Sequence, residues 1–188
     1  MTAPTPAEIE AALETCSGLL DPSRPLLVVS LHNSLLHAEP HRYVAVESPS
    51  ARSFLLTGRS THTSVAYDIQ RKKRVFIKDS WRIVAADTMM EGQVCQMLNR
   101  GKVKNVPSCV DFCDVGEDRY HQTQTQNFFY APRVPRVLRY LIPVLRHHRL
   151  ILDNVDNKLE NFGSSCELAR AVRAAIVGTK PLCFVLRF

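Results

Sequence analysis

Three short apolar runs within residues 53–78 constrain the fold of this chain more than any other feature. The runs SFLLTG, SVAYDI and VFIK are each long enough for one β-strand, and the connections between them are short and polar. Strands with such short connections pair antiparallel, so the segment predicts a three-stranded meander. The third run ends on Lys78, and a lysine on the buried side of a strand is costly unless an anionic group meets it.

The residues before this meander predict one helix and two extended segments. Thr5-Pro6-Ala7-Glu8 has the pattern of a capping box with proline at the first helical position, and the helix is expected to end near Gly18. Residues 26–30 and 43–47 are possible short strands. We therefore interpret residues 1–52 as a helical and extended segment that precedes the main domain, residues 53–177.

The residues after the meander predict a helix, two strands and a final helix. Residues 87–99 carry apolar side chains at helical spacing, and Gly101 is suited to end that helix. VPSCVDF and RLILDNV predict strands, and SSCELARAVRAAIV predicts a helix. This order favours an α+β fold in which an antiparallel five-stranded sheet holds one central helix, with an N-terminal helix and a C-terminal helix in addition.

A polar and then basic insertion, residues 119–148, separates the last two predicted strands. Its prolines argue against regular structure. Several arginines alternate with tyrosines and could meet an acidic partner or nucleic acid, namely Arg133, Arg136, Arg139 and Arg146 with Tyr130 and Tyr140. A non-catalytic scaffold or regulatory module that uses this insertion is the alternative function. A solvated loop is the simpler interpretation, and nucleic acid is not expected as a partner.

Composition excludes several classes of protein and site. Apolar residues make up 45% of the 188 residues, which argues against wholesale disorder, and no apolar run approaches the ~20 residues that span a bilayer. The N-terminus lacks the basic and apolar regions of a secretory signal. The six cysteines form no CxxC, and Cys109 and Cys113 lack a histidine pair at zinc spacing. We expect reduced thiols, no metal site, no membrane partner and an intracellular location in the cytoplasm or nucleus. The net charge of +6 suits anionic partners such as nucleotides.

The spacing around Lys78 points to phosphate binding. Four positions match a glycine-rich phosphate loop, G-x-G-x-x-G-x-V, with two glycines replaced by small hydroxyl residues: Gly58, Ser60, Thr63 and Val65. Lys78 follows this loop, and Glu91 follows Lys78 inside the predicted helix. In such lobes a strand lysine grips the α- and β-phosphates of ATP, and a helix glutamate holds the lysine.

Four segments resemble the small lobe of the fungal-type protein kinase family: LLTGRSTHTSVAYD, VFIKDSWR, EGQVCQMLNRGKVKNVPSC and HRLILDNVDNKLENFGSSCELARAVRAAI. Together they span roughly residues 54–177. The resemblance implies a kinase-like fold, binding of ATP with Mg²⁺, and transfer of phosphate to Ser or Thr. It places Leu152 as gatekeeper, Asp153 and Val155 in the hinge that contacts adenine, and Val65 and Ala66 against the purine.

The chain departs from this family because the motifs of the second lobe are missing. His148-Arg149-Leu150 and Asn161-Phe162-Gly163 imitate the catalytic-loop and metal-site motifs, but they lack the aspartates and stand too close together. We therefore assign no catalytic or metal-binding residue, and we expect weak or no ATP binding and no phosphotransfer by this chain alone. A protein partner is expected to use the surface that a second lobe would cover. The apolar tail, residues 178–188, is interpreted more simply as the end of a shortened reading frame than as a cover for that surface.

Overall fold

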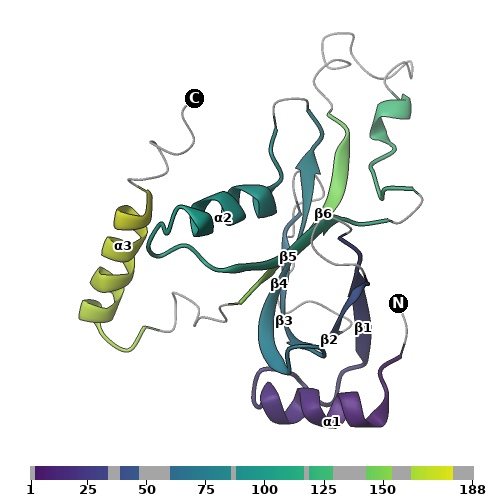
Figure 1. The fold of residues 1–188 in the computed structure, drawn as a ribbon, viewed down its shortest axis with the longest axis horizontal. Coiled ribbons are helices and arrows are strands. Elements are labelled where there is room, and N and C mark those ends of the chain that lie inside the picture. The colour runs from purple at the N-terminus through teal and green to yellow at the C-terminus, as the bar shows by residue number, and fades with distance from the viewer. Residues whose placement is uncertain are drawn as a thin grey trace.

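The computed structural model describes residues 3–33, 39–46, 60–85, 88–116, 119–128, 143–153 and 162–179, which form an α+β fold (Figure 1). The helices are α1 (Pro6–Thr15), α2 (Glu91–Arg100) and α3 (Ser165–Thr179), with a short 3-10 helix η1 (Thr125–Phe128). The strands are β1 (Leu26–Leu31), β2 (His41–Val46), β3 (His62–Asp68), β4 (Lys73–Ile83), β5 (Cys109–Asp114) and β6 (Leu145–Leu152).

All six strands of the described residues belong to one antiparallel sheet in the order β1-β2-β3-β4-β6-β5. The prediction of five strands is wrong, because β1 and β2 join the sheet through pairs such as Val44 with Tyr67. Strands β1 and β2 of the N-terminal segment thus extend the sheet. The predicted strand SFLLTG lies outside the described residues.

The sheet curls until its two edge strands approach each other. Asn33, just after β1, closes the gap by donating hydrogen bonds from Nδ2 to the carbonyl oxygen of Phe112 and to Oδ1 of Asp111, both on β5. The concave side of the curl holds the main hydrophobic core, which includes Tyr43, Val75 and Ile151, each fully buried. Burial of such side chains contributes roughly 1.5–3 kcal/mol each, so this interior holds the curled sheet together.

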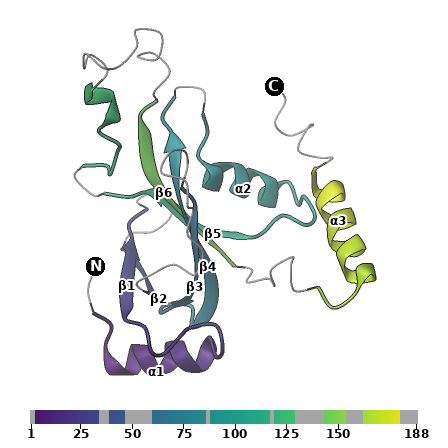
Figure 2. The same cartoon turned by 180° about the vertical axis from the view of Figure 1, so that it is seen from behind.

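The convex side of the sheet carries α1 and α2 at opposite ends (Figures 1 and 2). Helix α1 packs against β2, β3 and β4, and Ala12 and Cys16 pack with Val44 and Tyr67. The predicted capping box of α1 is confirmed, because the Thr5 amide donates to Glu8 and the Glu8 amide donates to the Thr5 hydroxyl. Helix α2 instead packs beside β5. A strip made of parts of β3, β4 and β6 therefore lies between the two helices.

Helix α3 forms where the sequence predicts it. The Ser164 hydroxyl accepts a hydrogen bond from the Glu167 amide at 3.2 Å, and Asn105 reaches the Ala174 carbonyl oxygen at 3.0 Å. Strand β6 begins at Leu145, within the predicted insertion, and continues through 148–150, so the first of the two imitated kinase motifs is ordinary strand. No helix within the described residues is long and apolar enough to cross a membrane.

Candidate functional site

An ion pair between Lys78 and Glu91 forms the centre of the candidate site. Lys78 Nζ lies 2.6 Å from Oε1 of Glu91, and each side chain keeps about a third of its surface exposed, 29% and 35% respectively. Lys78 belongs to β4 and points to the convex side, where its cross-strand neighbours are Thr63 and Leu150. The expectation that an anionic group meets this lysine is confirmed, because Glu91 supplies it.

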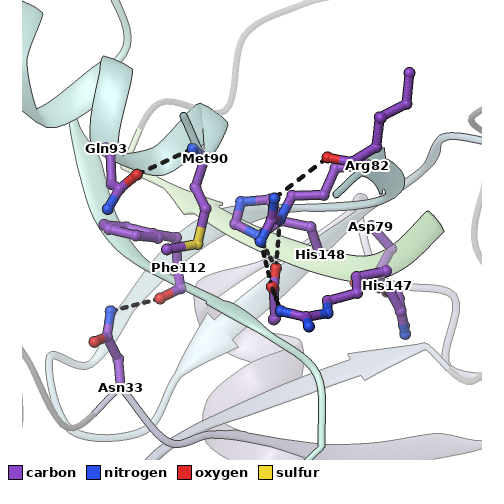
Figure 3. Close-up of polar contacts among 11 residues, drawn as sticks. Asn33, Asp79, Arg82, Met90, Gln93, Phe112, His147 and His148 are labelled. Carbon is purple, nitrogen blue, oxygen red and sulfur yellow. Dashed lines mark hydrogen bonds and ion pairs between the residues drawn. The ribbon is translucent and has the colours of Figure 1, made fainter. Parts of the chain in front are cut away.

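The start of α2 brings Glu91 to this position. Glu91 is the first residue of the helix, which begins a few residues later than predicted, and the Met90 amide donates to Oε1 of Gln93 (Figure 3). Gly92 follows and packs so closely on Phe112 that a Cβ there would overlap the ring. Leu98, 4% exposed, holds the far end of the same helix face. Only a glycine at position 92 lets the helix approach β5 this closely.

A row of apolar side chains crosses the strip beside Lys78. Val65 lies directly opposite Phe76, and Phe76 lies directly opposite Leu152 in the sheet. Directly opposed residues of antiparallel strands point to the same face, and these three side chains are only partly buried. The resemblance implies that Val65 lies against the purine and that Leu152 is the gatekeeper, and the structure brings these two residues to either side of Phe76 on the lysine's face.

A cavity of about 450 Å³ opens on the other side of Lys78, between β4 and the beginning of α2. Lys78 and Glu91 form one of its walls. The remaining lining combines polar and apolar side chains, namely Thr61, Ser80, Arg82, Ile83, Thr88, Met89 and His148. The volume lies within the range of about 300–1,000 Å³ typical of small-molecule sites.

Asp114 holds two of these lining residues, Arg82 and His148, in place. Arg82 binds the carboxylate through Nε at 2.7 Å and Nη2 at 2.5 Å, and Nδ1 of His148 lies 3.1 Å from Oδ1. Burial alone would raise the pKa of Asp114, but the hydrogen bonds from His148 and Arg82 outweigh it and hold the pKa well below its usual range. Asp114 therefore stays ionised, and the two side chains that it anchors are fixed beside the cavity.

The predicted phosphate loop is described only in part. Gly58 lies outside the described residues, as does the hinge residue Val155. Ser60 has a positive φ of 26°, and its hydroxyl lies 3.3 Å from Nε2 of His62. Thr63 is already in β3, opposite Lys78. The structure thus brings Thr63 to the lysine, while Ser60 marks the point at which the chain enters the strand.

Two other predicted residues have structural partners instead of open surfaces. Ala66 is fully buried in the concave core with Val75, on the face opposite to Val65, so the structure does not bring it to Lys78. Neighbouring strand residues point to opposite faces, which is why Val65 and Ala66 separate. Asp153 pairs with Lys73 at 2.6 Å, and its amide donates to the Ser108 carbonyl oxygen.

Sequence reasoning missed Phe76 and His148. The signal for Phe76 was present, because it stands two residues before Lys78 and two-residue periodicity puts both side chains on one face. His148 was assigned to the insertion, since the basic run RHHR masks the beginning of β6. Within the described residues, no group of three or more His, Cys, Asp or Glu side chains could hold a metal ion.

The predicted basic insertion contributes only its two ends to the described structure. The Arg146 guanidinium lies 4.2 Å from the ring centre of Tyr120, and Arg146 also approaches Asp114 at 3.7 Å. The remaining arginines and both tyrosines assigned to the alternative function, Arg133, Arg136, Arg139, Tyr130 and Tyr140, lie outside the described residues.

Comparison of the chain with protein-family models, with curated proteins and with solved structures gives no match.

Proposed function

We propose that this chain forms an ATP-binding small lobe of the fungal-type protein kinase class, with Lys78 as the residue that contacts the α- and β-phosphates of Mg·ATP. The single observation that supports this most is the 2.6 Å contact between Lys78 and Glu91. In protein kinases a strand lysine and a helix glutamate form such a pair, which positions the lysine for the nucleotide.

The surroundings of the pair support the same function. The apolar row of Val65, Phe76 and Leu152 lies beside the lysine on the same face, and nucleotide sites combine an apolar surface for the base with few polar groups for the phosphates. Both members of the ion pair are partly exposed, so a ligand can reach the ammonium group without unfolding α2.

Phosphate transfer is not part of this proposal for the 188 residues alone. Alignment of ATP, metal ions and an acceptor hydroxyl requires a catalytic-loop aspartate and a metal-binding aspartate, and neither motif occurs in the sequence. We propose weak nucleotide binding without catalysis, because an open half-site leaves much of the ligand in water.

Calorimetric titration with Mg·ATP tests the proposal. Lys78→Met removes a charge-assisted contact of about 1.5–3 kcal/mol, which corresponds to a loss of roughly 10- to 150-fold in affinity. The matched control is Lys104→Met, which removes an exposed lysine between α2 and β5 and should leave the affinity unchanged. Glu91→Gln should give an intermediate loss.

Two results would overturn the proposal: no Mg·ATP binding by the unaltered chain up to about 1 mM, near the weak end of measurable affinity, or equal affinities of the Lys78→Met and Lys104→Met variants. If the chain does not bind Mg·ATP but binds RNA or DNA with an affinity that falls steeply with salt, the function is nucleic-acid binding by the basic insertion instead.

A further inference from the structure

We propose that the cavity at the beginning of α2 binds the phosphate group of a small phosphomonoester, and that His148 is its principal ligand residue. This site lies on the opposite side of Lys78 from the apolar row, and it does not depend on nucleotide binding by that row. His148 is buried and lacks a full set of hydrogen-bond partners within the described residues.

His148 is 1% exposed, yet Nε2 makes no hydrogen bond to any part of the chain that the structure describes. The other ring nitrogen, Nδ1, contacts Asp114. Because Asp114 is an ionised acceptor, Nδ1 carries a proton, and Nε2 is left to face a partner. A buried polar atom without a hydrogen-bond partner costs about 1–3 kcal/mol of stability. Because His148 lines the cavity, a ligand bound there would supply the missing partner of Nε2.

The charges around the cavity favour an anion. The cationic side chains around it outnumber the carboxylates by three to two: Lys78, Arg82 and Arg146 compared with Glu91 and Asp114. The N-terminus of α2 adds a partial positive charge of roughly half a unit. Its N-cap residue is Met90, whose thioether is at best a weak acceptor, so the first-turn amides lack the oxygen that Ser, Thr or Asp would offer.

The remaining lining residues favour a phosphate ester over a bare ion. Hydroxyl groups from Thr61, Ser80 and Thr88 can donate to phosphate oxygens, while Ile83 and Met89 offer apolar contacts to an organic group. The cavity of about 450 Å³ is also much larger than a single ion needs. The second pKa of a phosphomonoester is about 6, so near neutral pH a single proton can be shared between the ligand and Nε2.

Inorganic phosphate is the probe for a first experiment on the complete chain. The ring nitrogens of His148 are followed by long-range ¹H–¹⁵N NMR during the titration, with chloride at equal ionic strength as the reference. We expect the Nε2 signal to shift and saturate with phosphate, while the signals of His121, an exposed histidine, stay constant. A shift that chloride reproduces, or no shift of Nε2, would overturn the proposal.

Variants then separate this site from the nucleotide site. His148→Leu should weaken phosphate binding at least tenfold and leave Mg·ATP binding intact, whereas His121→Leu should change neither. Thr88→Val changes a residue at the rim of the cavity and should weaken phosphate binding without loss of folding. Equal phosphate affinity in His148→Leu and the unaltered chain contradicts the proposal, even if Lys78→Met abolishes binding of Mg·ATP.

The pH dependence of sulfate binding gives an independent readout. Sulfate does not gain a proton near neutral pH, so its contact with Nε2 requires the imidazolium form. Acid favours that form, and sulfate affinity should therefore rise as pH falls. The charged groups that line the cavity or pair with its lining residues are Asp114 from β5, Lys78 and Arg82 from β4, Arg146 from β6 and Glu91 from α2. A flat profile excludes His148 as the ligand residue.

Discussion

Gly92, the second residue of α2, lies directly against the ring of Phe112 on β5. The contact fixes how close the helix comes to the sheet, and Glu91 precedes Gly92 in the chain. The distance between Glu91 and Lys78 is therefore set by a packing contact on the neighbouring strand as well as by their own charges. This relationship makes the ion pair sensitive to a substitution that touches neither of its members.

Gly92→Ala should destabilise the chain and disrupt the Lys78–Glu91 pair. The added methyl group has no room beside Phe112, and overpacking of this kind costs roughly 1–3 kcal/mol. Urea unfolding should show the loss as a lower midpoint with an unchanged slope. Gly101→Ala is the matched control, because a Cβ there meets its nearest neighbour at an ordinary 3.4 Å. Equal stability of the two variants would show that α2 does not depend on this close approach.

Asn33→Ala should loosen the closure of the curled sheet. The substitution removes hydrogen bonds to the Phe112 carbonyl oxygen and to Asp111, both on the opposite edge strand. Loss of partners for buried polar groups costs about 1–3 kcal/mol. Hydrogen exchange should become faster in β1 and β5 while the amides of β3 and β4 keep most of their protection. Asn127→Ala, at an exposed position, should leave the exchange of all four strands unchanged.

Asp79 should make stability fall in acid. Burial opposes its ionisation, but the hydrogen bonds from His147 and Arg149 outweigh burial and lower its pKa to about 2. Because an unfolded aspartate titrates near 3.9, the stabilisation is present above about pH 4 and is lost as pH falls through about 2, with a size of roughly 2 kcal/mol. Asp79→Asn should lose this amount at neutral pH and converge with the unaltered chain near pH 2.

Exposed glutamate provides the control for that titration. Glu10→Gln alters a solvent-facing carboxylate of α1, and its free energy of unfolding should stay within about 0.5 kcal/mol of the unaltered chain at every pH. If Asp79→Asn follows the Glu10→Gln curve instead, the contacts of Asp79 with Arg149 and His147 do not contribute to stability.

Thiol labelling should distinguish Cys16 from Cys166. Cys16 is fully buried at the C-terminal end of α1, where burial raises the pKa of its thiol to about 11, whereas Cys166 is exposed on α3. Because the thiolate is the reactive form, iodoacetamide at pH 8 should modify Cys166 rapidly and Cys16 only at the rate of unfolding. Mass spectrometry of the labelled peptides gives both rates, and rapid modification of Cys16 under native conditions would contradict the packing of α1.

Local signals in the sequence predicted the helices and the ion pair correctly. The Thr5 and Glu8 cap acts over three residues, so its hydrogen bonds follow from spacing alone. The match between Lys78 and Glu91 came from the spacing of a strand and the following helix. The kinase-like function that we attached to this spacing stays a prediction.

The long-range features could not be derived in the same way. Nothing near residues 41–46 in the sequence indicates that Val44 pairs with Tyr67, because the pairing depends on how the whole sheet curls. His148 was interpreted only as part of an imitated motif within the basic insertion, although it lies in the middle of β6 and is among the most buried polar residues described. Burial of a polar side chain is a property of the assembled sheet, so the local pattern of apolar and polar residues does not predict it.

The position of β6 between β4 and β5 also determines when the sheet can be completed during synthesis. Strands β1 to β4 pair in chain order, but β5 has no strand to pair with until β6, residues 145–152, leaves the ribosome and inserts between β4 and β5. Until then the nascent chain presents two unpaired strand edges, and such edges recruit other chains. Translation speed across residues 115–152 therefore sets how long the newly made protein is exposed to wrong partners, and a slow codon placed there should lower its yield of folded product.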